Sequence, residues 1–335
     1  MDLIKSLEDA AGAGNVLVQE PMSTHTSFRA GGPADIFVKP SSAGQAAAVI
    51  RACREAGAEL FVLGNGTNML VSDRGFRGVV MDMSGLDSCA EVPAEASDVH
   101  AGGGAPETGA KAAAGGRDDA DTGDGDLHVI RAGAGLPLAR LARFALEKGL
   151  GGLPFAAGIP GTVGGACVMN AGAYGGEIKD VLLSVTVLDA NGCMLTISAE
   201  DLDLGYRHSC IPEKGWTVVS ADLGLKPADR EAVRAEMEDL AGRRRDRQPL
   251  EYPSAGSTFK RPEGHFAGKL IQDAGLAGKR VGGASVSEKH CGFVINDRGG
   301  TASDIYELIR LVQAEVLRSQ GVELTMEVRL LGDFD

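Results

Sequence analysis

Glycine is concentrated in two segments of this 335-residue chain, and these segments restrict what the chain can form. The first, GNGTNML (residues 64–70), follows the short apolar run Leu60–Leu63, and the second, residues 151–177, holds nine of the 48 glycines. Glycine adopts positive φ and lets the backbone approach other groups closely. The second segment also contains Phe155 and Tyr174, so we expect a structured loop and not a linker.

Successive backbone N–H groups in glycine-rich loops bind anions, so both segments are candidate phosphate sites. GNGTN lacks the Gly-Lys-Ser/Thr ending of a P-loop and the third glycine of a Rossmann fingerprint, and taken alone it fits a tight turn equally well. GIPGTVGGACVMNAGAYG (residues 158–175) adds further N–H donors and the side-chain amide of Asn170. Two such loops far apart in sequence fit an extended, diphosphate-bearing cofactor better than a compact nucleotide, so they indicate a dinucleotide held without a Rossmann motif.

Helix and strand signals alternate along the chain, which indicates an α/β or α+β class. Residues 41–56 begin with serines suited to a helix cap and end at Gly57, and in residues 301–321 Thr301 and Asp304 stand in capping-box relation. The other expected elements are strands at 60–63, 129–132 and 324–331, a hairpin over 182–198 with an Asn-Gly turn, and helices at 137–149 and about 228–246.

Composition excludes several classes of protein. The net charge of −13 argues against general binding to nucleic acid or anionic membrane, since both require basic surface. No run approaches the roughly 18 apolar residues of a membrane span, and MDLIKSLEDA is not a secretory signal, so we expect a cytoplasmic protein. The six cysteines are scattered without C-x-x-C or metal spacing, so we expect free thiols, no disulfide framework and no metal site.

Residues 88–126 differ from the rest of the chain. Twelve of the sixteen residues 101–116 are Gly or Ala, and residues 118–126 contain five aspartates in nine positions. Such a stretch buries little apolar surface, so we expect a disordered acidic insertion. A calcium loop of the EF-hand kind needs a fixed ligand spacing with a terminal Glu, which is absent.

The stretch YPSAGSTFKRP (residues 252–262) places Ser257 after a glycine. It does not match Gly-x-Ser-x-Gly, and no spacing favours a histidine among His208, His265 and His290 as its base, so a nucleophile is disfavoured. Seen alone, the stretch favours a hydroxyl that bonds to backbone in a turn. Arg207 and Glu327 stand among apolar residues and must pair with or bind something; a structural ion pair remains open.

Eight motifs in order resemble the UDP-N-acetylenolpyruvoylglucosamine reductase (MurB) family, and they cover nearly the whole chain apart from the insertion. They are THTSFRAGGPADIFVKP, LGNGTNMLVSDRGFRGVVM, GIPGTVGGACVMNAGAYGGEI, GYRHS, EYPSAGSTFKRP, GHFAGKLIQDAGLAG, VSEKHCGFVIN and EVRLLG. The short spacing between GYRHS and AGSTF is similar to the spacing in the type II subgroup, whose members lack an extra insertion in the substrate lobe.

The resemblance implies an α+β fold with a two-lobed FAD-binding domain of the vanillyl-alcohol-oxidase (PCMH) type and a smaller α/β substrate-binding domain. The FAD-binding domain is expected over residues 1–225, with lobes at about 1–86 and 87–225. The substrate-binding domain is expected over residues 226–335, with its last strand packed on the first lobe.

The family reaction reduces an enolpyruvyl ether of a UDP-sugar to a lactyl ether, with NADPH as co-substrate and FAD held non-covalently. By resemblance, Ser257 is the proton donor, Arg207 faces the substrate carboxylate, and Glu327 is a carboxyl group at the same end. Glu327 either orients Arg207 or, if protonated, donates a hydrogen bond. Gly256 is expected to let the backbone of Ser257 approach the substrate.

The expected FAD and substrate contacts also come from the resemblance. The expected FAD contacts are Gly64, Asn65, Gly66, Thr67 and Asn68 in the first segment, and Gly158, Ile159, Pro160, Gly161, Thr162, Gly164, Gly165, Asn170, Gly172, Ala173 and Tyr174 in the second. Tyr206, Lys260 and Gln272 resemble substrate contacts, and arginines within 243–247 are candidates for the UDP diphosphate.

Three interpretations follow: a cytoplasmic, monomeric reductase of peptidoglycan precursor synthesis, an oxidase with the same flavin fold, or a catalytically silent nucleotide-binding protein. An oxidase of this fold usually carries a His or Cys for covalent flavin attachment, and GNGTN has neither. A silent protein keeps the glycine loops and loses Ser257, Arg207 or Glu327, whereas this chain has all three.

Overall fold

The computed structural model describes residues 2–93 and 127–334, and the chain divides into two compact units. The first unit consists of Met1–Gly85, Ala190–Gly192 and Ala241–Asp335, and the second of Leu86–Asp189 and Cys193–Leu240. The boundary after Gly85 lies next to the expected lobe boundary at residue 86. The expected substrate-binding domain at 226–335 stays a prediction, because the unit that contains Ala241–Asp335 also contains Met1–Gly85.

The N-terminal part of the first unit is built on a four-stranded sheet in the order β1-β2-β5-β3. Strand β1 pairs antiparallel with β2, and β2 and β3 both pair parallel with β5. Strands β2 and β3 run parallel on either side of β5, and α2 is the crossover that connects them. The elements are α1 (Leu3–Ala11), β1 (Val16–Pro21), β2 (Pro33–Val38), α2 (Ala43–Ala56), β3 (Leu60–Leu63), β4 (Met69–Val71) and β5 (Phe76–Asp82).

The ends of α2 follow from its sequence. The Ser42 hydroxyl accepts a hydrogen bond from the Gln45 amide at 3.2 Å, and Gly57 ends the helix in the left-handed conformation. This confirms the helix expected at 41–56, and β3 confirms the strand expected at 60–63.

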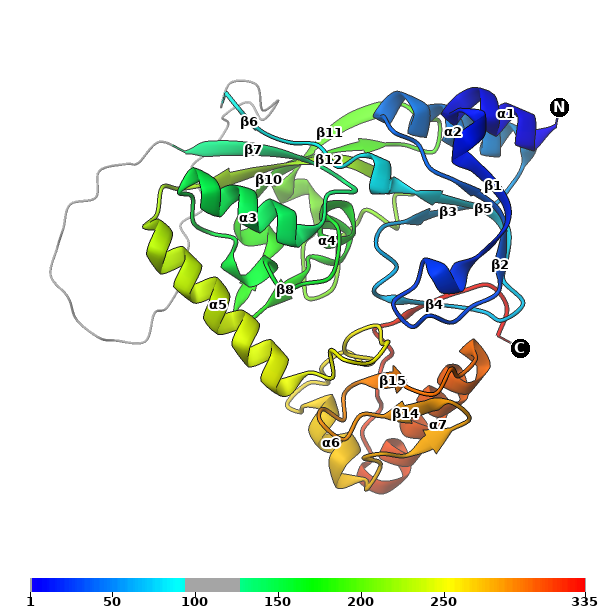
Figure 1. Cartoon of the computed structure of the whole chain (residues 1–335), viewed down its shortest axis with the longest axis vertical. Coiled ribbons are helices and arrows are strands. Elements are labelled where there is room, and N and C mark those ends of the chain that lie inside the picture. Colours follow the sequence, from blue (N-terminus) through cyan, green and yellow to red (C-terminus); the bar gives the residue numbers. More distant parts are fainter. Residues whose placement is uncertain (1, 94–126, 335) are drawn as a thin grey trace, which may run out of the picture. The chain divides into compact units, whose positions relative to one another are not determined.

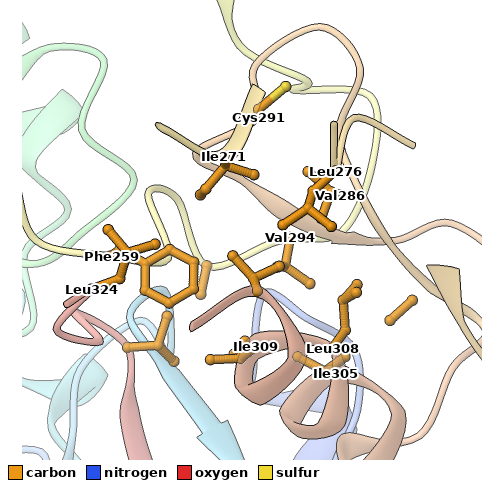
Figure 2. Packing of buried hydrophobic residues seen from close by; sticks show 14 of the residues in the cluster. Phe259, Ile271, Leu276, Val286, Cys291, Val294, Ile305, Leu308, Ile309 and Leu324 are labelled. Atoms are coloured by element: carbon orange, nitrogen blue, oxygen red, sulfur yellow. The ribbon is translucent and has the colours of Figure 1, made fainter. Parts of the chain in front are cut away.

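The C-terminal part of the first unit is a three-stranded antiparallel sheet with helix α7 packed against it (Figure 1). Figure 2 shows its core, where Leu308 and Ile309 of α7 meet Val286 and Val294 of the sheet. These four side chains are at most 1% exposed, and each fully buried aliphatic side chain stabilises the fold by about 1.5–3 kcal/mol. The elements are α6 (Ala267–Asp273), β13 (Arg280–Val281), β14 (Ala284–Val286), β15 (Val294–Asn296), α7 (Ala302–Gln320) and β16 (Arg329–Leu331).

The N-terminus of α7 is capped both by residues at its own start and by Asp73, which is distant in sequence. Thr301 and Asp304 form the expected capping box. The carboxylate of Asp73, from the turn between β4 and β5, accepts hydrogen bonds from the amides of Ala302 and Ser303, both at 2.8 Å. Amides of the first helical turn have no partner within their own helix, so Asp73 ties the β4–β5 turn to α7.

The final strand is shorter than expected. Only Arg329–Leu331 form β16, and residues 324–328 are held instead by single backbone bonds, such as the bridge between Phe259 and Met326. Strand β16 pairs in parallel with β4, so the C-terminal strand lies against Met69–Val71 as expected.

The second unit is built on a five-stranded antiparallel sheet in the order β11-β10-β12-β7-β6 (Figure 1). The hairpin expected at 182–198 is β10 with β11, and the helices expected at 137–149 and 228–246 are α3 and α5. The elements are β6 (Cys89–Val92), β7 (His128–Gly133), α3 (Leu138–Lys148), α4 (Val163–Met169), β8 (Gly172–Ala173), β9 (Gly176–Glu177), β10 (Leu182–Leu188), β11 (Met194–Ser198), β12 (Thr217–Leu225) and α5 (Arg230–Arg247), which extends past Leu240 into the first unit.

The prediction for residues 88–126 was wrong at its start. Cys89–Val92 form β6 and pair with β7, because β7 offers a free edge of the sheet to an extended segment. The remainder of that prediction, residues 94–126, lies outside the described residues. Over the described ranges, no helix is long and apolar enough to cross a membrane.

Candidate active site

The first glycine segment connects β3 to β4 and is seated on the backbone of residues 25–27. Gly66 has φ +61°, and a Cβ added there would lie 1.9 Å from the carbonyl oxygen of His25. The Gly66 carbonyl accepts a hydrogen bond from the Ser27 amide at 3.0 Å. Glycine is therefore required at position 66 for both its φ and its close contact.

Asn68, at the end of this segment, connects it to Glu327. Its carbonyl accepts a hydrogen bond from the Arg329 amide at 3.0 Å, and its side-chain Nδ2 donates to the Glu327 carbonyl at 3.3 Å. These bonds continue the pairing of β16 with β4, so the backbone of Glu327 is fixed beside the glycine segment.

Ser257 lies next to the residue that pairs with Glu327. The Glu327 amide donates to the Thr258 carbonyl at 2.8 Å, and the buried Thr258 hydroxyl accepts from the Val294 amide at 3.0 Å. Ser257 is exposed and follows Gly256, whose φ is +75°. The first unit therefore brings Ser257, Glu327 and the segment 64–68 into one region.

Gly256 has a backbone conformation that favours glycine, with φ +75°. A Cβ built on Gly256 meets no protein atom within 4 Å, so contact with the rest of the protein does not require glycine there. The expected approach of Ser257 to the substrate stays a prediction.

The expected substrate contacts are divided between the units. Lys260 and Gln272 belong to the first unit, where the Lys260 amide donates to the Thr325 carbonyl at 2.9 Å and Gln272 is exposed on α6. Tyr206 belongs to the second unit and is exposed beside Arg207. The arginines within 243–247 lie in the last turns of α5.

The second glycine segment is more regular than the expected loop. It contains the short helix α4, followed by the β8–β9 hairpin, and α4 packs against β12 and β7. Gly164 packs closely against Ala134, where an added Cβ would lie 2.9 Å from the Ala134 Cβ. Gly158, Pro160, Gly165 and Tyr174 are exposed on the same segment.

Asn170 ends α4 in the left-handed conformation, with φ +39°, and its side chain is fully buried. Its Nδ2 donates to the Glu177 carboxylate at 2.9 Å and to the Gly205 carbonyl at 3.0 Å, while its Oδ1 accepts from the Lys179 amide at 3.0 Å. Both amide hydrogens are thereby used within the protein. This side-chain amide is thus bonded within the protein, and the expected cofactor contact of Asn170, like that of the backbone of 170–174, stays a prediction.

Arg207 lies in a tight turn that Gly205 and His208 close with reciprocal backbone hydrogen bonds of 3.1 and 3.2 Å. Its φ is +53°, and its Nη2 donates to the Gly172 carbonyl at 3.1 Å. The guanidinium also lies 5.2 Å from the centre of the Tyr206 ring. The second unit thus brings Arg207, Tyr206 and the β8–β9 hairpin together.

A carboxylate sits beside this group. Burial raises the pKa of Glu177, but hydrogen bonds from Lys179 and Asn170, and the charges of Lys179 and Arg207, outweigh it and hold that pKa below its usual value. Glu177 is therefore ionised at neutral pH, and its negative charge attracts the cationic side chains of Lys179 and Arg207.

Each glycine segment, taken by itself, has features compatible with binding a diphosphate. Neither GNGTN nor residues 158–165 contain an acidic side chain that would repel a diphosphate. An added Cβ at the exposed Gly165 meets nothing closer than the Thr162 hydroxyl at 3.6 Å, so its backbone is accessible. Burial raises the pKa of Cys167 to about 12, so this thiol, inside the second segment, is not suited to covalent attachment.

Sequence reasoning missed the residues that support the site. Glu177 and Lys179 hold Asn170, and Asp73 holds α7, yet their residue types alone predict no such role. Glu177 and Asp73 stand inside the motifs GIPGTVGGACVMNAGAYGGEI and LGNGTNMLVSDRGFRGVVM. Glu177 was the easier of the two to single out, since it is an acidic residue between glycines and an apolar strand.

Comparisons with known proteins agree with these features. Residues 34–117 and 119–198 match the FAD binding domain family, and residues 248–331 match the C-terminal domain family of UDP-N-acetylenolpyruvoylglucosamine reductase. The α+β fold with an FAD-binding domain is thus confirmed, and the protein is of the FAD-binding class.

Relatives over the full length define the family. The UDP-N-acetylenolpyruvoylglucosamine reductase of Agathobacter rectalis is 47% identical, with 99% of this chain and 98% of the relative covered. That of Clostridium botulinum is 43% identical, covering 99% and 97%. The crystal structure of MurB from Thermus caldophilus is similar with a TM-score of 0.70 at 30% identity, covering 95% of this chain and 98% of the other. The chain belongs to the UDP-N-acetylenolpyruvoylglucosamine reductase family.

Proposed function

We propose that this protein is a cytoplasmic, NADPH-dependent FAD enzyme that reduces the enolpyruvyl ether of UDP-N-acetylglucosamine to UDP-N-acetylmuramate, in the synthesis of peptidoglycan precursors. The observation that carries the proposal is membership of the reductase family over 99% of the chain, together with the presence of Ser257, Arg207 and Glu327. Bound FAD, once reduced by NADPH, supplies a hydride to the methylene carbon of the substrate.

Arg207 acts on the substrate carboxylate. When the methylene carbon takes hydride, the adjacent carbon gains negative charge that spreads into the carboxylate. A planar guanidinium offers paired donors to that carboxylate, and its attraction grows as the charge develops. The hydrogen bond to the Gly172 carbonyl orients the Arg207 guanidinium, which supports this role.

Ser257 supplies the proton that completes the reaction. The carbon next to the carboxylate becomes strongly basic, so a serine hydroxyl is acidic enough to protonate it when correctly placed. The exposed position of Ser257 after Gly256, on a segment fixed by Thr258, supports this role. Glu327 adds a carboxyl group in the same region, with its backbone held by Thr258 and Asn68.

The experiment separates the two halves of the reaction by stopped-flow absorbance of the flavin. NADPH alone should bleach the yellow protein at the same rate in wild type and in Ser257→Ala. Reoxidation by the enolpyruvyl nucleotide should slow by about 10²- to 10⁴-fold in the variant, since this is the usual contribution of a positioned general acid.

Ser254→Ala is the matched control, because it removes a hydroxyl from the same segment and should leave both steps near normal. Equal damage to both steps in Ser257→Ala contradicts the proton-donor role. Reoxidation of the wild type by oxygen alone, with no response to the nucleotide, indicates an oxidase, and a preparation that cannot be reconstituted with FAD indicates a silent protein.

A further inference from the structure

The buried amide of Asn170 connects the turn that carries Arg207 to the β8–β9 hairpin. We infer that Asn170 is a positioning residue, which fixes the direction of the Arg207 guanidinium and so acts on the substrate carboxylate through Arg207. The inference rests on the function proposed above, because it assigns Arg207 to that carboxylate.

The backbone at both residues is held in an unfavourable conformation. Asn170 has φ +39° and Arg207 has φ +53°. For a residue with a side chain, the left-handed region costs roughly 1–2 kcal/mol, and asparagine tolerates it better than arginine. Such a conformation at Arg207 persists only where the surroundings fix it, and it clusters at functional sites.

The Asn170 amide supplies that fixation, and its orientation is set by its partners. Its Nδ2 faces two acceptors, the Glu177 carboxylate at 2.9 Å and the Gly205 carbonyl at 3.0 Å, and its Oδ1 faces the Lys179 amide at 3.0 Å. Gly205 opens the turn that contains Arg207. A buried amide left without one of these partners costs about 1–3 kcal/mol, so the structure is most stable with all three bonds formed.

The same amide fixes the other side of the guanidinium. Arg207 donates to the carbonyl of Gly172, which pairs with Glu177 across the β8–β9 hairpin. Asn170 bonds Glu177 and Gly205 with the same nitrogen, so it holds the hairpin and the turn at one separation. Without the amide, the bond from Arg207 to Gly172 and the bond from Ser209 to the Val168 carbonyl remain, but the bond that fixes Gly205 relative to the hairpin is lost.

The test compares Asn170→Gly with wild type in the two half-reactions. Glycine adopts the left-handed conformation without strain, so this variant removes the amide and keeps the backbone. We expect unchanged FAD content and NADPH bleaching, and reoxidation by the enolpyruvyl nucleotide slowed by about tenfold to a hundredfold, the loss expected when a catalytic group is misplaced by about 1 Å.

A double-mutant cycle with Arg207→Ala decides whether Asn170 acts through Arg207. In the Arg207→Ala background, Asn170→Gly should slow reoxidation by no more than about threefold further, because the group that it positions is gone. A full further loss in that background overturns the inference. So does normal reoxidation in Asn170→Gly alone.

Asp222→Asn is the matched control for stability. Asp222 is buried in the same unit and bonds Arg131 through two hydrogen bonds of 2.7 Å, outside the hairpin and the turn. It should lower the melting temperature and leave the ratio of the two half-reactions unchanged.

A second variant, Asn170→Asp, is isosteric and turns a carboxylate oxygen toward Glu177 and Gly205, so it should slow reoxidation at least as much as Asn170→Gly. If both Asn170 variants lose FAD while Asp222→Asn retains it, Asn170 is a determinant of the whole fold and the inference is wrong. If wild type itself is not reoxidised by the nucleotide, the proposed function fails first and the inference with it.

Discussion

The two glycine segments are supported in different ways. The segment 64–68 rests on backbone: Gly66 packs on the backbone of residues 25–27, and the carbonyl of Asn68 continues the pairing of β4 with β16. The second segment, residues 151–177, depends on the buried side-chain amide of Asn170 and on the strained backbone at Arg207, to whose turn that amide bonds. Both segments should resist an added Cβ where a glycine packs closely, as at Gly66 and Gly164, but only the amide-supported segment should be sensitive to the loss of a side chain.

The largest expected effect is that of Gly66→Ala on the backbone-supported segment. The new Cβ would lie 1.9 Å from the His25 carbonyl, and φ +61° is unfavourable for alanine. The left-handed conformation costs about 1–2 kcal/mol and overpacking about 1–3 kcal/mol more. We expect the free energy of unfolding to fall by the sum of these two costs. We also expect FAD to be lost during gel filtration.

Gly57→Ala is the control for Gly66→Ala. Gly57 also has positive φ, at +64°, but an added Cβ there meets no atom within 4 Å. Gly57→Ala should lower the free energy of unfolding only by the cost of the left-handed conformation, and the variant should retain FAD. Equal losses in the two variants would show that φ alone, and not the contact with residues 25–27, sets the requirement for glycine.

Asn68→Ala removes an asparagine side chain from the backbone-supported segment, as Asn170→Gly does from the other. It loses one hydrogen bond of 3.3 Å to the Glu327 carbonyl, and the bond from the Arg329 amide to the Asn68 carbonyl remains. One such bond contributes about 0.5–1.5 kcal/mol to stability. We expect the free energy of unfolding, measured in urea titrations, to fall by no more than this, and a fall as large as that of Asn170→Gly would remove the contrast between the segments.

The smallest expected effect is that of replacing Asp73, whose carboxylate caps the N-terminus of α7. Burial raises its pKa, but hydrogen bonds from the side chain and amide of Ser303 and the amide of Ala302 outweigh it and keep the pKa below its usual value. A lowered pKa means that the stabilisation is complete above the unfolded value of about 3.9 and disappears as pH falls through the folded value.

Asp73→Ala should therefore lower the free energy of unfolding by about 1 kcal/mol at pH 7, at the low end of cap energies because Asp73 is exposed. In urea titrations the difference from wild type should shrink as pH falls below the unfolded value of about 3.9. Asp273→Ala, which breaks an exposed pair with Lys269, removes the same charge and should change stability much less. A difference that persists in acid would show that Asp73 does not act through its ionised carboxylate.

The sequence predicted those helices and strands whose caps and turns are formed by residues close together in the chain. Helix α7 was predicted because Thr301, Asp304 and Gly321 lie within or next to it, and the β10–β11 hairpin because its turn and alternation are contiguous. The role of Asn170 was not predicted, because Gly205 lies 35 residues away in sequence and no pattern connects the two. Asp73 was missed for the same reason, since its partners on α7 lie 229 and 230 residues further along.

The bond between Asn68 and Glu327 joins residues that lie 259 positions apart. During synthesis the first glycine segment leaves the ribosome long before the strand β16 that supports it exists, and contacts of such wide sequence separation form slowly. The first glycine segment is therefore completed only when the last strand docks. Cofactor capture should accordingly follow translation, and a nascent chain stalled before Arg329 should not retain flavin.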